Sequence, residues 1–346
     1  MSTTTESIRN RAFRLRQRPV GEPAPGDLEL VEEDLPALAD GEILVRTLYL
    51  SVDPTNRLWM SDMRQYSPPV ELGAVMRGIG VGEVLESRRD DISVGDIVFG
   101  YTQWQEYCVA GPEAGFGVLP NPLPAPLTAF LGALGHTGLT AYIGLGMADL
   151  KAGETLVVSA AGGAVGSIVG QIAKARGARA VGITGGAEKA RHVVEELGFD
   201  ACVDRLAPDW REHFDAATPD GVDVNFENVG GEIMDHVFMR LNMNARVILC
   251  GMISQYDAAG AGSSWQGQVN MGQILMQRVT MRGFIVSDHV EEFAAGAGYL
   301  AGLLAEGRLK YDETIVEGFD QAPAALHKLF TGEKAGKLLV HVADPS

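Results

Sequence analysis

The sequence predicts an α/β protein that combines a β-barrel domain with a doubly wound parallel sheet. Short runs of alternating and β-branched residues fill the chain up to about residue 125, and from about residue 129 strands alternate with helices. Between these parts, residues 119–126 contain four prolines and mark a boundary. The chain has 346 residues, which is long enough for two domains.

Strands of the first domain are expected where alternation is clear or glycine and aromatic residues punctuate the chain, at 41–52, 77–85, 97–100 and 104–109. A helix at 131–145 then leads into the second domain. The strands of that domain are expected at 155–159, 178–183, 201–203, 222–225, 246–250 and 281–285. The C-terminal part is expected to form a strand at 313–317, a helix at 321–331 and a strand at 337–342.

The turn after the first strand of the second domain carries the strongest functional signal. Thr155–Ser159 is apolar on both faces, and Ala161, Gly163 and Gly166 follow it in an A-x-G-x-x-G pattern. Small residues let the backbone approach a pyrophosphate, and the amides of the next helix would point at the phosphates. Because a second strand at 178–183 completes the unit, we interpret it as a dinucleotide-binding βαβ unit rather than an ordinary βα turn.

The residues after the second strand favour NADP over NAD. An NAD site usually places an acid about twenty residues past the first glycine, but the loop after Ile183 has none. Lys189 and Arg205 follow and could hold a 2′-phosphate. Glu188 argues in the other direction, and Lys189 could also be a solvated cation at a helix start.

Composition excludes several classes of protein. The formal net charge of −17 argues against nucleic acid or an anionic membrane as a partner. No run of 18 apolar residues suggests a membrane span, and the N-terminus lacks the features of a signal peptide. Cys108, Cys202 and Cys250 lie too far apart for a disulfide framework or a CxxC site, so we expect a reducing, cytoplasmic location.

Seven phrases along the chain match one family in order and spacing: LSVDPTNR (50–57), GLTAY (138–142), SAAGGAVGSIVGQIAK (159–174), ENVGGE (227–232), CGMISQY (250–256), RGFIV (282–286) and GKLLV (336–340). The chain resembles the zinc-independent branch of the medium-chain dehydrogenase/reductase superfamily. Within it, the chain is most similar to the NADP-dependent 2-alkenal reductases, which include prostaglandin/leukotriene reductases and bacterial curcumin-type reductases.

The resemblance implies a fold and an assembly. A GroES-like domain would comprise residues 1–128 and 311–346, and a Rossmann NADP-binding domain residues 129–310. The active site would lie between them, and the protein would form a homodimer. The stretches that hold zinc ligands in related alcohol dehydrogenases read 51–53 (SVD) and 77–79 (RGI) here, so no metal is expected.

The resemblance also implies site residues. Tyr256 would be catalytic, with its hydroxyl near the nicotinamide ribose and the substrate carbonyl. The NADP(H)-binding residues would be Thr140, Gly163, Ala164, Val165, Gly186, Lys189, Arg205, Asn228, Gly251, Ile253, Ser254, Phe284 and Val286. The substrate pocket would include Tyr49, Asn56, Trp59, His136 and Trp265.

Departures from the family affect this pocket. Thr55 and Asn56 replace a more apolar pair, and Arg205 stands where the family commonly has tyrosine. His136 could donate a hydrogen bond or a proton to a substrate, although packing at a helix start is favoured because no orienting partner is visible in the sequence.

These residues predict hydride transfer from NADPH to the β-carbon of an α,β-unsaturated ketone or aldehyde, with the enolate stabilised by hydrogen bonds. A quinone reductase would use the same cofactor site, and a zinc alcohol dehydrogenase fits poorly. A protein that binds NADPH without turnover is the alternative from another class.

Overall fold

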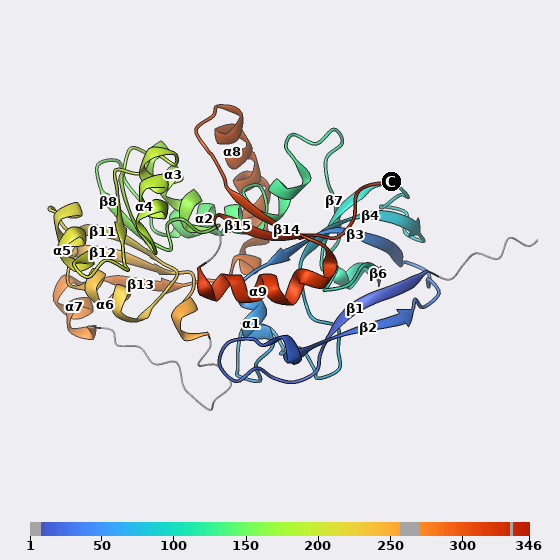
Figure 1. The fold of residues 1–346 in the computed structure, drawn as a ribbon. Helices are drawn as coiled ribbons and strands as arrows, with labels where there is room; N and C mark the ends of the chain where they lie inside the picture. Colours follow the sequence, from blue (N-terminus) through green and yellow to red (C-terminus); the bar gives the residue numbers. More distant parts are fainter. Residues whose placement is uncertain (1–7, 257–269, 333–334) are drawn as a thin grey trace, which may run out of the picture.

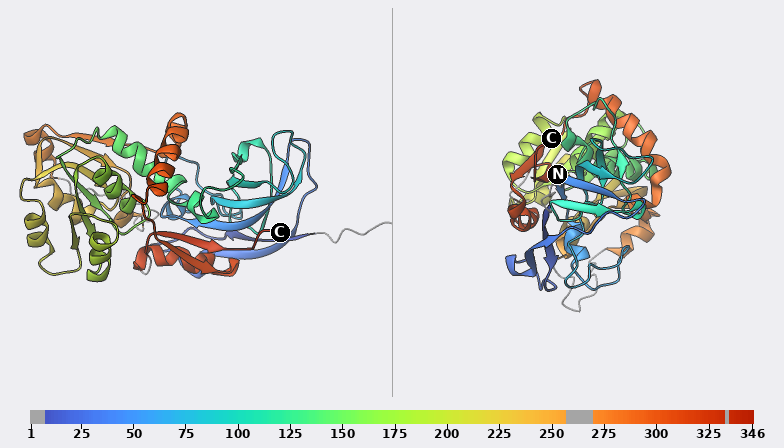
Figure 2. Two further views of the ribbon diagram at one scale, coloured as in Figure 1. Left: turned by 90° about the horizontal axis from the view of Figure 1, so that it is seen from above. Right: turned by 90° about the vertical axis from the view of Figure 1, so that its right-hand side faces the viewer.

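The structure is a computed structural model that describes residues 8–256, 270–332 and 335–346. Two lobes lie side by side, and the last strands of the chain return to the lobe that contains the first strands (Figures 1 and 2). One lobe is a mostly antiparallel barrel and the other a parallel sheet with helices. The predicted fold class, a GroES-like domain with a Rossmann domain, is confirmed.

Strand β3 (Ile43–Val52) is the centre of the barrel sheet. It pairs antiparallel with β4, β6 and β15, and most of its side chains are buried, as its alternating apolar sequence predicts. A separate ribbon of two strands covers one side. The barrel lobe contains β1 (Arg9–Leu15), β2 (Leu28–Asp34), α1 (Thr55–Trp59), β4 (Gly80–Ser87), β5 (Ile97–Gly100), β6 (Tyr107–Ala110), β7 (Gly117–Val118), β14 (Glu313–Glu317), α9 (Ala322–Thr331) and β15 (Lys337–His341).

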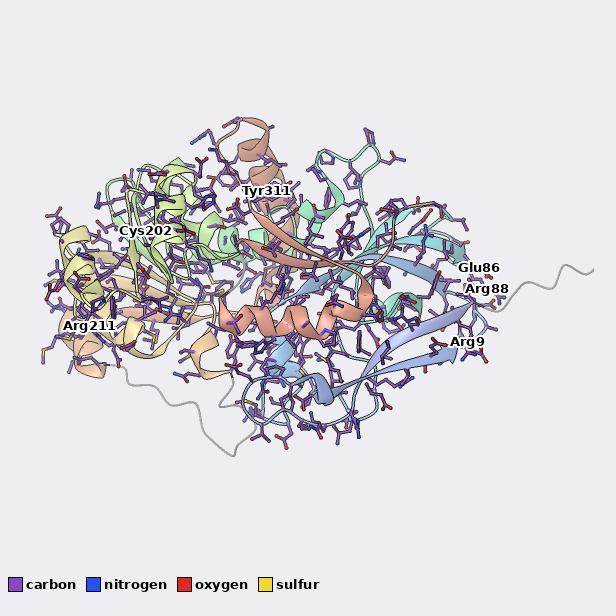
Figure 3. All side chains as sticks on the ribbon, viewed as in Figure 1. Arg9, Glu86, Arg88, Cys202, Arg211 and Tyr311 are labelled. Carbon is purple, nitrogen blue, oxygen red and sulfur yellow. The ribbon has the colours of Figure 1, made fainter. Side chains whose placement is uncertain are left out.

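The chain returns to the barrel near Tyr311, which lies between the two lobes (Figure 3). Strand β14 pairs in parallel with β15, and β15 continues the barrel sheet by pairing with β3. Helix α9 packs its apolar face on the barrel core through Ala325, Leu326 and Leu329. The C-terminal segment is therefore part of the barrel, while the residue boundaries of the two domains stay predictions.

The second lobe has the strand order β10-β9-β8-β11-β12-β13. This is the strand order of a Rossmann sheet. The chain starts at β8, builds outward through β9 and β10, and then crosses back to add β11, β12 and β13 on the other side of β8. The order of the strands therefore reverses between β8 and β11. The lobe contains α2 (His136–Met147), β8 (Thr155–Ser159), α3 (Gly166–Ala175), β9 (Arg179–Thr184), α4 (Ala187–Glu195), β10 (Ala201–Asp204), α5 (Trp210–Ala217), β11 (Val222–Glu227), α6 (Gly231–Phe238), β12 (Leu241–Leu249), α7 (Met271–Gln277), β13 (Thr280–Gly283) and α8 (Phe293–Ala305).

Helices cover both faces of this sheet. Leu156 and Val158 of β8 join a core with α2, α3 and α8, whereas Val157 faces the opposite core with α5 and α6. All five residues of β8 are consequently buried, as expected for an inner parallel strand. Among the described residues, no helix is both long and apolar enough to cross a bilayer.

Two predicted elements differ from the structure at their ends. The helix predicted at 131–145 is a 3₁₀ turn, Leu127–Leu131, followed by α2 from His136. The chain makes a tight turn between these two elements, and the backbone of Gly135 lies close to the carbonyl oxygen of Phe130. A Cβ at position 135 would be only 1.8 Å from that oxygen, so the turn requires glycine. The last sheet strand ends at Gly283 rather than at 285, because the following residues leave the sheet edge.

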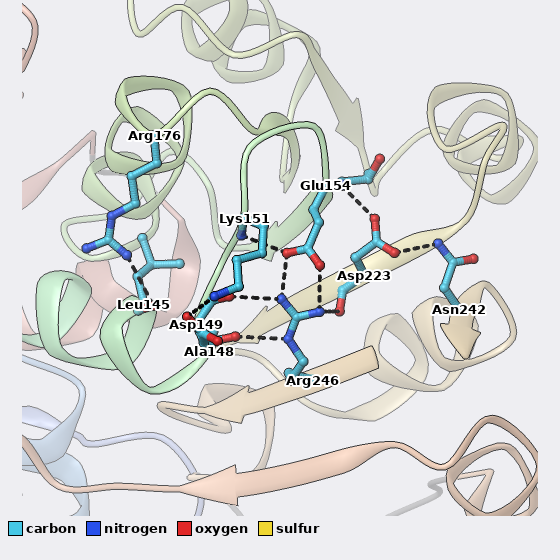
Figure 4. A network of polar contacts seen from close by, with 10 residues as sticks. Leu145, Ala148, Asp149, Lys151, Glu154, Arg176, Asp223, Asn242 and Arg246 are labelled. Carbon is cyan, nitrogen blue, oxygen red and sulfur yellow. Dashed lines mark hydrogen bonds and ion pairs between the residues drawn. The ribbon is translucent and has the colours of Figure 1, made fainter. Parts of the chain in front are cut away.

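A network of hydrogen bonds and ion pairs lies at the end of the parallel sheet where strands β8 and β11 begin (Figure 4). Arg246 makes two hydrogen bonds to Glu154, of 2.9 and 2.5 Å, and its Nε donates to the carbonyl oxygen of Ala148 at 2.9 Å. The Asp223 carboxylate accepts from the Thr155 amide at 2.8 Å. The network satisfies polar groups at this end, whereas the opposite end of the sheet opens into a cleft.

Candidate active site

A cleft of about 1100 Å³ lies between the two lobes. Its walls come from the loops after β8, β9, β11, β12 and β13 on one side, and from α1, the end of α9 and the start of β15 on the other. Ligands of open α/β sheets bind outside the carboxyl ends of the strands, where the chain order reverses. The cleft occupies that position.

The glycine-rich turn after β8 has the geometry that a pyrophosphate needs. The amide of Gly163 donates to the carbonyl oxygen of Ala160 at 2.8 Å, and Ala160 adopts a left-handed conformation with φ of 54°. A Cβ at Gly166 would lie 2.4 Å from the same oxygen, so only glycine fits there. Helix α3 begins at Gly166, which lines the cleft, so the positive N-terminal end of the helix lies at the cleft wall.

Two cations lie where β9 and β10 end. The Lys189 ammonium donates to the carbonyl oxygen of Gly332, and burial lowers its pKa, with a further decrease from nearby Arg205. Within the described residues, the Arg205 guanidinium makes no hydrogen bond or ion pair. A Cβ at Gly185 would be 3.5 Å from Arg205 Nε, so the loop lies against this guanidinium. The pair fits a 2′-phosphate better than a ribose hydroxyl.

A buried carboxylate shapes the loop after β11. Glu227 is fully buried and accepts from the Ser159 hydroxyl and the Val229 amide, both at 2.7 Å, and from the Gly230 amide at 2.9 Å. The Asn228 side chain donates to the carbonyl oxygen of Ser159 at 2.8 Å. These bonds fix Asn228 beside the glycine-rich turn.

Tyr256 lines the cleft as a buried phenol that is 8% exposed. Its hydroxyl accepts from the Met252 amide at 3.2 Å, and burial raises its pKa to about 12. A Cβ at Gly251 would be 3.0 Å from this hydroxyl, so the ring depends on glycine at that position. Tyr256 is therefore neutral at physiological pH and keeps its proton.

A Lys–Asp pair lies on the barrel side of the cleft. Lys337 Nζ is 3.2 Å from Asp53 Oδ1, and it donates to the carbonyl oxygens of Val52 and Leu338 at 3.1 and 2.9 Å. Burial raises the pKa of Asp53, but the Lys337 ammonium and the Ser51 hydroxyl outweigh it and hold that pKa below its usual value. The carboxylate is thus ionised and held in place.

His136 faces the same part of the cleft. Burial lowers its pKa, while the Asp53 carboxylate acts in the opposite direction. The imidazole is therefore neutral near pH 7. Thr140 donates a hydrogen bond from its hydroxyl to the backbone carbonyl oxygen of His136 at 2.7 Å, so the orientation of the Thr140 side chain is fixed in the first turn of α2.

Most predicted site residues line the cleft, and their roles stay predictions. Asn56 and Trp59 line it, but the Asn56 side chain is used to hold the backbone: it accepts from the Asp53 amide at 2.8 Å and donates to the Arg77 carbonyl oxygen at 3.1 Å. The cofactor-binding predictions that line the cleft are Thr140, Gly163, Ala164, Val165, Lys189, Arg205, Asn228, Gly251, Ile253, Ser254, Phe284 and Val286.

Two predicted residues are described and do not line the cleft, and a third cannot be placed. Tyr49 lies in β3 directly opposite His341 of β15, so their side chains share one face of the sheet and the two ring centres are 4.9 Å apart. Gly186 does not line the cleft, but its amide donates to Asp204 at 2.6 Å at the start of α4. Trp265 lies outside the described residues.

Several residues that line the cleft could not be expected, or were not expected, from the sequence. Lys337 had a signal in the sequence, because it opens an otherwise apolar strand, and a lysine that is buried there needs a partner. Tyr66 and Arg64 come from an irregular loop without a periodic pattern, so their position could not be predicted. Cys250 also lines the cleft, but burial raises its pKa to about 12, with a smaller contribution from Glu227, so it is a poor nucleophile.

One group of potential metal ligands occurs among the described residues. The ligand atoms of His289, Glu291 and Glu292 lie within 4.8 Å of one another. None of the three lines the cleft, and exposed acids often cluster without an ion. The group gives no reason to place a metal in the reaction.

Comparisons with known proteins agree with this site. Residues 11–118 match the family model described as the N-terminal domain of oxidoreductase, and residues 164–300 match that described as zinc-binding dehydrogenase. The chain is 40% identical to the NADPH-dependent curcumin reductase of Escherichia coli over 97% of both chains. It is 33% identical to the NADP(+)-dependent 2-alkenal reductase of Nicotiana tabacum, over 98% of this chain and 99% of that one.

A solved structure extends the likeness to three dimensions. CurA from Vibrio vulnificus in complex with NADPH is 40% identical, with a TM-score of 0.91 over 97% of this chain and 100% of that one. The chain belongs to the medium-chain dehydrogenase/reductase superfamily, in the branch of curcumin, prostaglandin and 2-alkenal reductases. It is an NADPH-dependent reductase of a small molecule, and its cofactor is NADP(H).

Proposed function

We propose that this protein reduces the C=C bond of α,β-unsaturated ketones and aldehydes. The observation that carries the proposal is the neutral, buried phenol of Tyr256 in a cleft whose other walls fit NADPH. A phenol that keeps its proton can donate a hydrogen bond to a carbonyl oxygen as negative charge develops on it. The names of the curcumin and 2-alkenal reductases support the same class of reaction.

The chain positions the reactants. When bound, NADPH supplies the hydride, which would be added to the β-carbon of the substrate. Phe284 and Val286, which follow the end of β13, would pack against the nicotinamide side of the cleft, and Thr140 would face it from α2. Tyr256 would donate to the carbonyl oxygen and stabilise the enolate, and the α-carbon would then take a proton from water.

Lys189 and Arg205 would hold the 2′-phosphate. Their charges lie at the tips of β9 and β10, beside a glycine-rich turn that leaves room for the pyrophosphate. The Lys189 ammonium now bonds a carbonyl oxygen and could exchange it for a phosphate oxygen.

A steady-state screen of NADPH oxidation tests the proposal. The panel contains enals, enones, saturated aldehydes and 1,4-quinones, each with NADPH and with NADH. We expect turnover with enones and enals under NADPH, little with saturated aldehydes, and a much higher KM for NADH. Turnover confined to quinones would favour a quinone reductase, and NADPH binding without any oxidation would favour a non-catalytic protein.

We also propose a homodimer located in the cytoplasm. Strand β13 is the edge of the parallel sheet, and Met243, Leu275 and Met276 expose 57%, 72% and 63% of their surface on the neighbouring β12 and α7. Pairing of two β13 edges would cover unsatisfied backbone groups. A monomer mass in light scattering would contradict the dimer.

The proposed cytoplasmic location is supported by the cysteines. All three are free thiols, which suits a reducing compartment.

A further inference from the structure

Helix α4, which carries Lys189, is joined to the barrel lobe by a His–Asp pair outside the cleft. His192 Nε2 lies 2.7 Å from Asp312 Oδ2, and the two side chains are 39% and 33% exposed. His192 belongs to the Rossmann lobe, whereas Asp312 directly precedes β14, where the chain returns to the barrel. Neither residue lines the cleft. Any effect of the pair on a cofactor in the cleft must therefore pass through other residues.

Lys189 and His192 share one face of α4. They are three residues apart, so their side chains project from the same side of the helix. The Lys189 ammonium donates to the carbonyl oxygen of Gly332, which follows α9, and His192 contacts Asp312. This face of α4 consequently meets the returning C-terminal segment at two points, one of which is the lysine proposed to bind the 2′-phosphate.

The backbone of Asp312 is held in place on the barrel side. Its carbonyl oxygen accepts from the Lys337 amide at 2.8 Å, and a Cβ at Gly336 would lie 1.8 Å from the same oxygen. Two residues before Asp312, the Gln171 side chain holds both the amide and the carbonyl oxygen of Lys310, at 2.7 and 2.8 Å. The chain is thus anchored on both sides of Tyr311, and the Asp312 carboxylate extends from a fixed backbone.

The same segment also contacts the glycine-rich turn. The Gly336 amide donates to the carbonyl oxygen of Gly162 at 3.1 Å, and a Cβ at Gly162 would lie 4.0 Å from the Cβ of Lys189. The glycine-rich turn, the start of α4 and the segment that contains Asp312 therefore meet in one small region. A shift of α4 against that segment would move Lys189 relative to the turn.

The His192–Asp312 pair is the stronger of two side-chain pairs that the described residues form between α4, with its last residue's neighbour Glu196, and the returning segment. Glu196 and Lys310 are 3.3 Å apart, and both side chains are 58% exposed. An ion pair so open to solvent contributes little. His192 and Asp312 are closer together and less exposed, so their contact restrains α4 more strongly.

We propose that Asp312 is a positioning residue for NADPH, which acts through His192 to hold α4 so that Lys189 reaches the 2′-phosphate. This inference rests on the phosphate role proposed for Lys189 and deepens it, because the preference for NADPH over NADH then depends on a residue outside the cleft and in the other lobe. A binding group must be held within about 0.5 Å of its productive position, so a loosened helix weakens the bond to the phosphate.

The test measures how much the 2′-phosphate contributes to binding. Calorimetry gives the Kd values of adenosine 2′,5′-bisphosphate and of AMP, which differ only in that phosphate, and NADP⁺ and NAD⁺ repeat the comparison with whole cofactors. The variants are Asp312→Ala, Asp312→Asn, His192→Ala and Lys189→Gln. Asp215→Ala is the matched control, because Asp215 forms another His–Asp pair outside the cleft, 3.1 Å from His236.

We expect the ratio of the Kd for AMP to the Kd for the bisphosphate to fall by about two- to fivefold in Asp312→Ala, since the lost contact is a partly exposed pair. His192→Ala should give the same decrease. Asp312→Asn, which keeps a hydrogen-bonding partner for His192, should retain most of the ratio, and Asp215→Ala all of it. The Kd for AMP should change little, whereas a general loosening of the fold would weaken both ligands.

A double variant shows whether Asp312 acts through Lys189. In the Lys189→Gln background, Asp312→Ala should lower the ratio no further, because the two changes remove the same contact with the phosphate. A further decrease as large as that in Asp312→Ala alone would overturn the inference.

The outcomes separate this inference from the proposals on which it rests. A ratio that falls in Lys189→Gln but not in Asp312→Ala or His192→Ala overturns the inference and leaves the phosphate role of Lys189 in place. An unchanged ratio in Lys189→Gln overturns both. Because binding needs no turnover, a failure of enone reduction would be detected separately, in the substrate screen.

Discussion

The ammonium of Lys337 lies 3.2 Å from the carboxylate of Asp53, and the two residues come from opposite ends of the chain. Lys337 opens β15 and Asp53 follows β3, so the ion pair joins the C-terminal segment to the first half of the barrel. The preceding residue, Gly336, donates its amide to the carbonyl oxygen of Gly162 at 3.1 Å. Two consecutive residues thus connect the barrel, the cleft and the glycine-rich turn.

Removal of one partner of this pair should be costly. We expect Lys337→Met to lower the free energy of unfolding by about 3 kcal/mol, because it leaves a largely buried carboxylate without its cation. Denaturant unfolding measures the effect. The double variant Asp53→Asn/Lys337→Met should recover much of this loss. If the double variant instead loses as much stability as Asp53→Asn and Lys337→Met lose together, the two residues are not coupled.

The cations at the tips of β9 and β10 should decide cofactor choice. We expect Arg205→Gln to raise the KM for NADPH by about tenfold and to leave the KM for NADH unchanged, because a charge-assisted bond to the 2′-phosphate is lost. Lys189→Gln should act in the same direction. Arg191→Gln, a change on the exposed face of α4 outside the cleft, serves as the control. Equal increases in the KM values for NADPH and NADH would show that these cations do not bind the 2′-phosphate.

The Tyr256 hydroxyl should matter for rate more than for cofactor affinity. Tyr256→Phe keeps the ring and removes the hydrogen-bond donor, so we expect kcat to fall by about tenfold to a hundredfold while the Kd for NADPH changes little. Single-turnover kinetics and fluorescence titration measure the two quantities. An unchanged kcat would mean that the phenol is only a packing group.

His341 should give the barrel a pH-dependent stability near neutrality. A hydrogen bond to Glu317 of 2.7 Å raises the pKa of His341, while partial burial opposes the increase. A raised pKa in the folded state stabilises the protein fully below the ordinary value of about 6.5, and the stabilisation is lost as pH rises through the folded value. His341→Asn should therefore lower Tm at acidic pH and have little effect at alkaline pH. A loss of Tm in His341→Asn that becomes larger as the pH rises would contradict this prediction.

The sequence was sufficient for the fold because local and long-range signals agree. The apolar strand Thr155–Ser159, the glycines after it and the following helix specify one βαβ unit, and the structure has the strand at these residues. The start of α2 could not be predicted, since it depends on the close approach of Gly135 to the carbonyl oxygen of Phe130. Such a contact between backbone atoms leaves no periodic pattern.

The site was predictable where it follows strand ends and not where it comes from irregular loops. Asn228 and Gly251 follow strands β11 and β12, so sheet topology brings them together. Arg64 and Tyr66 come from the loop after α1, whose path depends on tertiary hydrogen bonds. Tyr49 was predicted to line the substrate pocket and does not, because strand alternation turns its ring toward His341 instead of the cleft.

The destination of the hydride tests the central claim most directly. The protein is incubated with an enone and with NADPH that carries deuterium at the transferred position of C4, and the product is examined by NMR. Our account predicts a saturated ketone with deuterium on the β-carbon. Deuterium on the carbonyl carbon of an alcohol, or a product without deuterium, would contradict it.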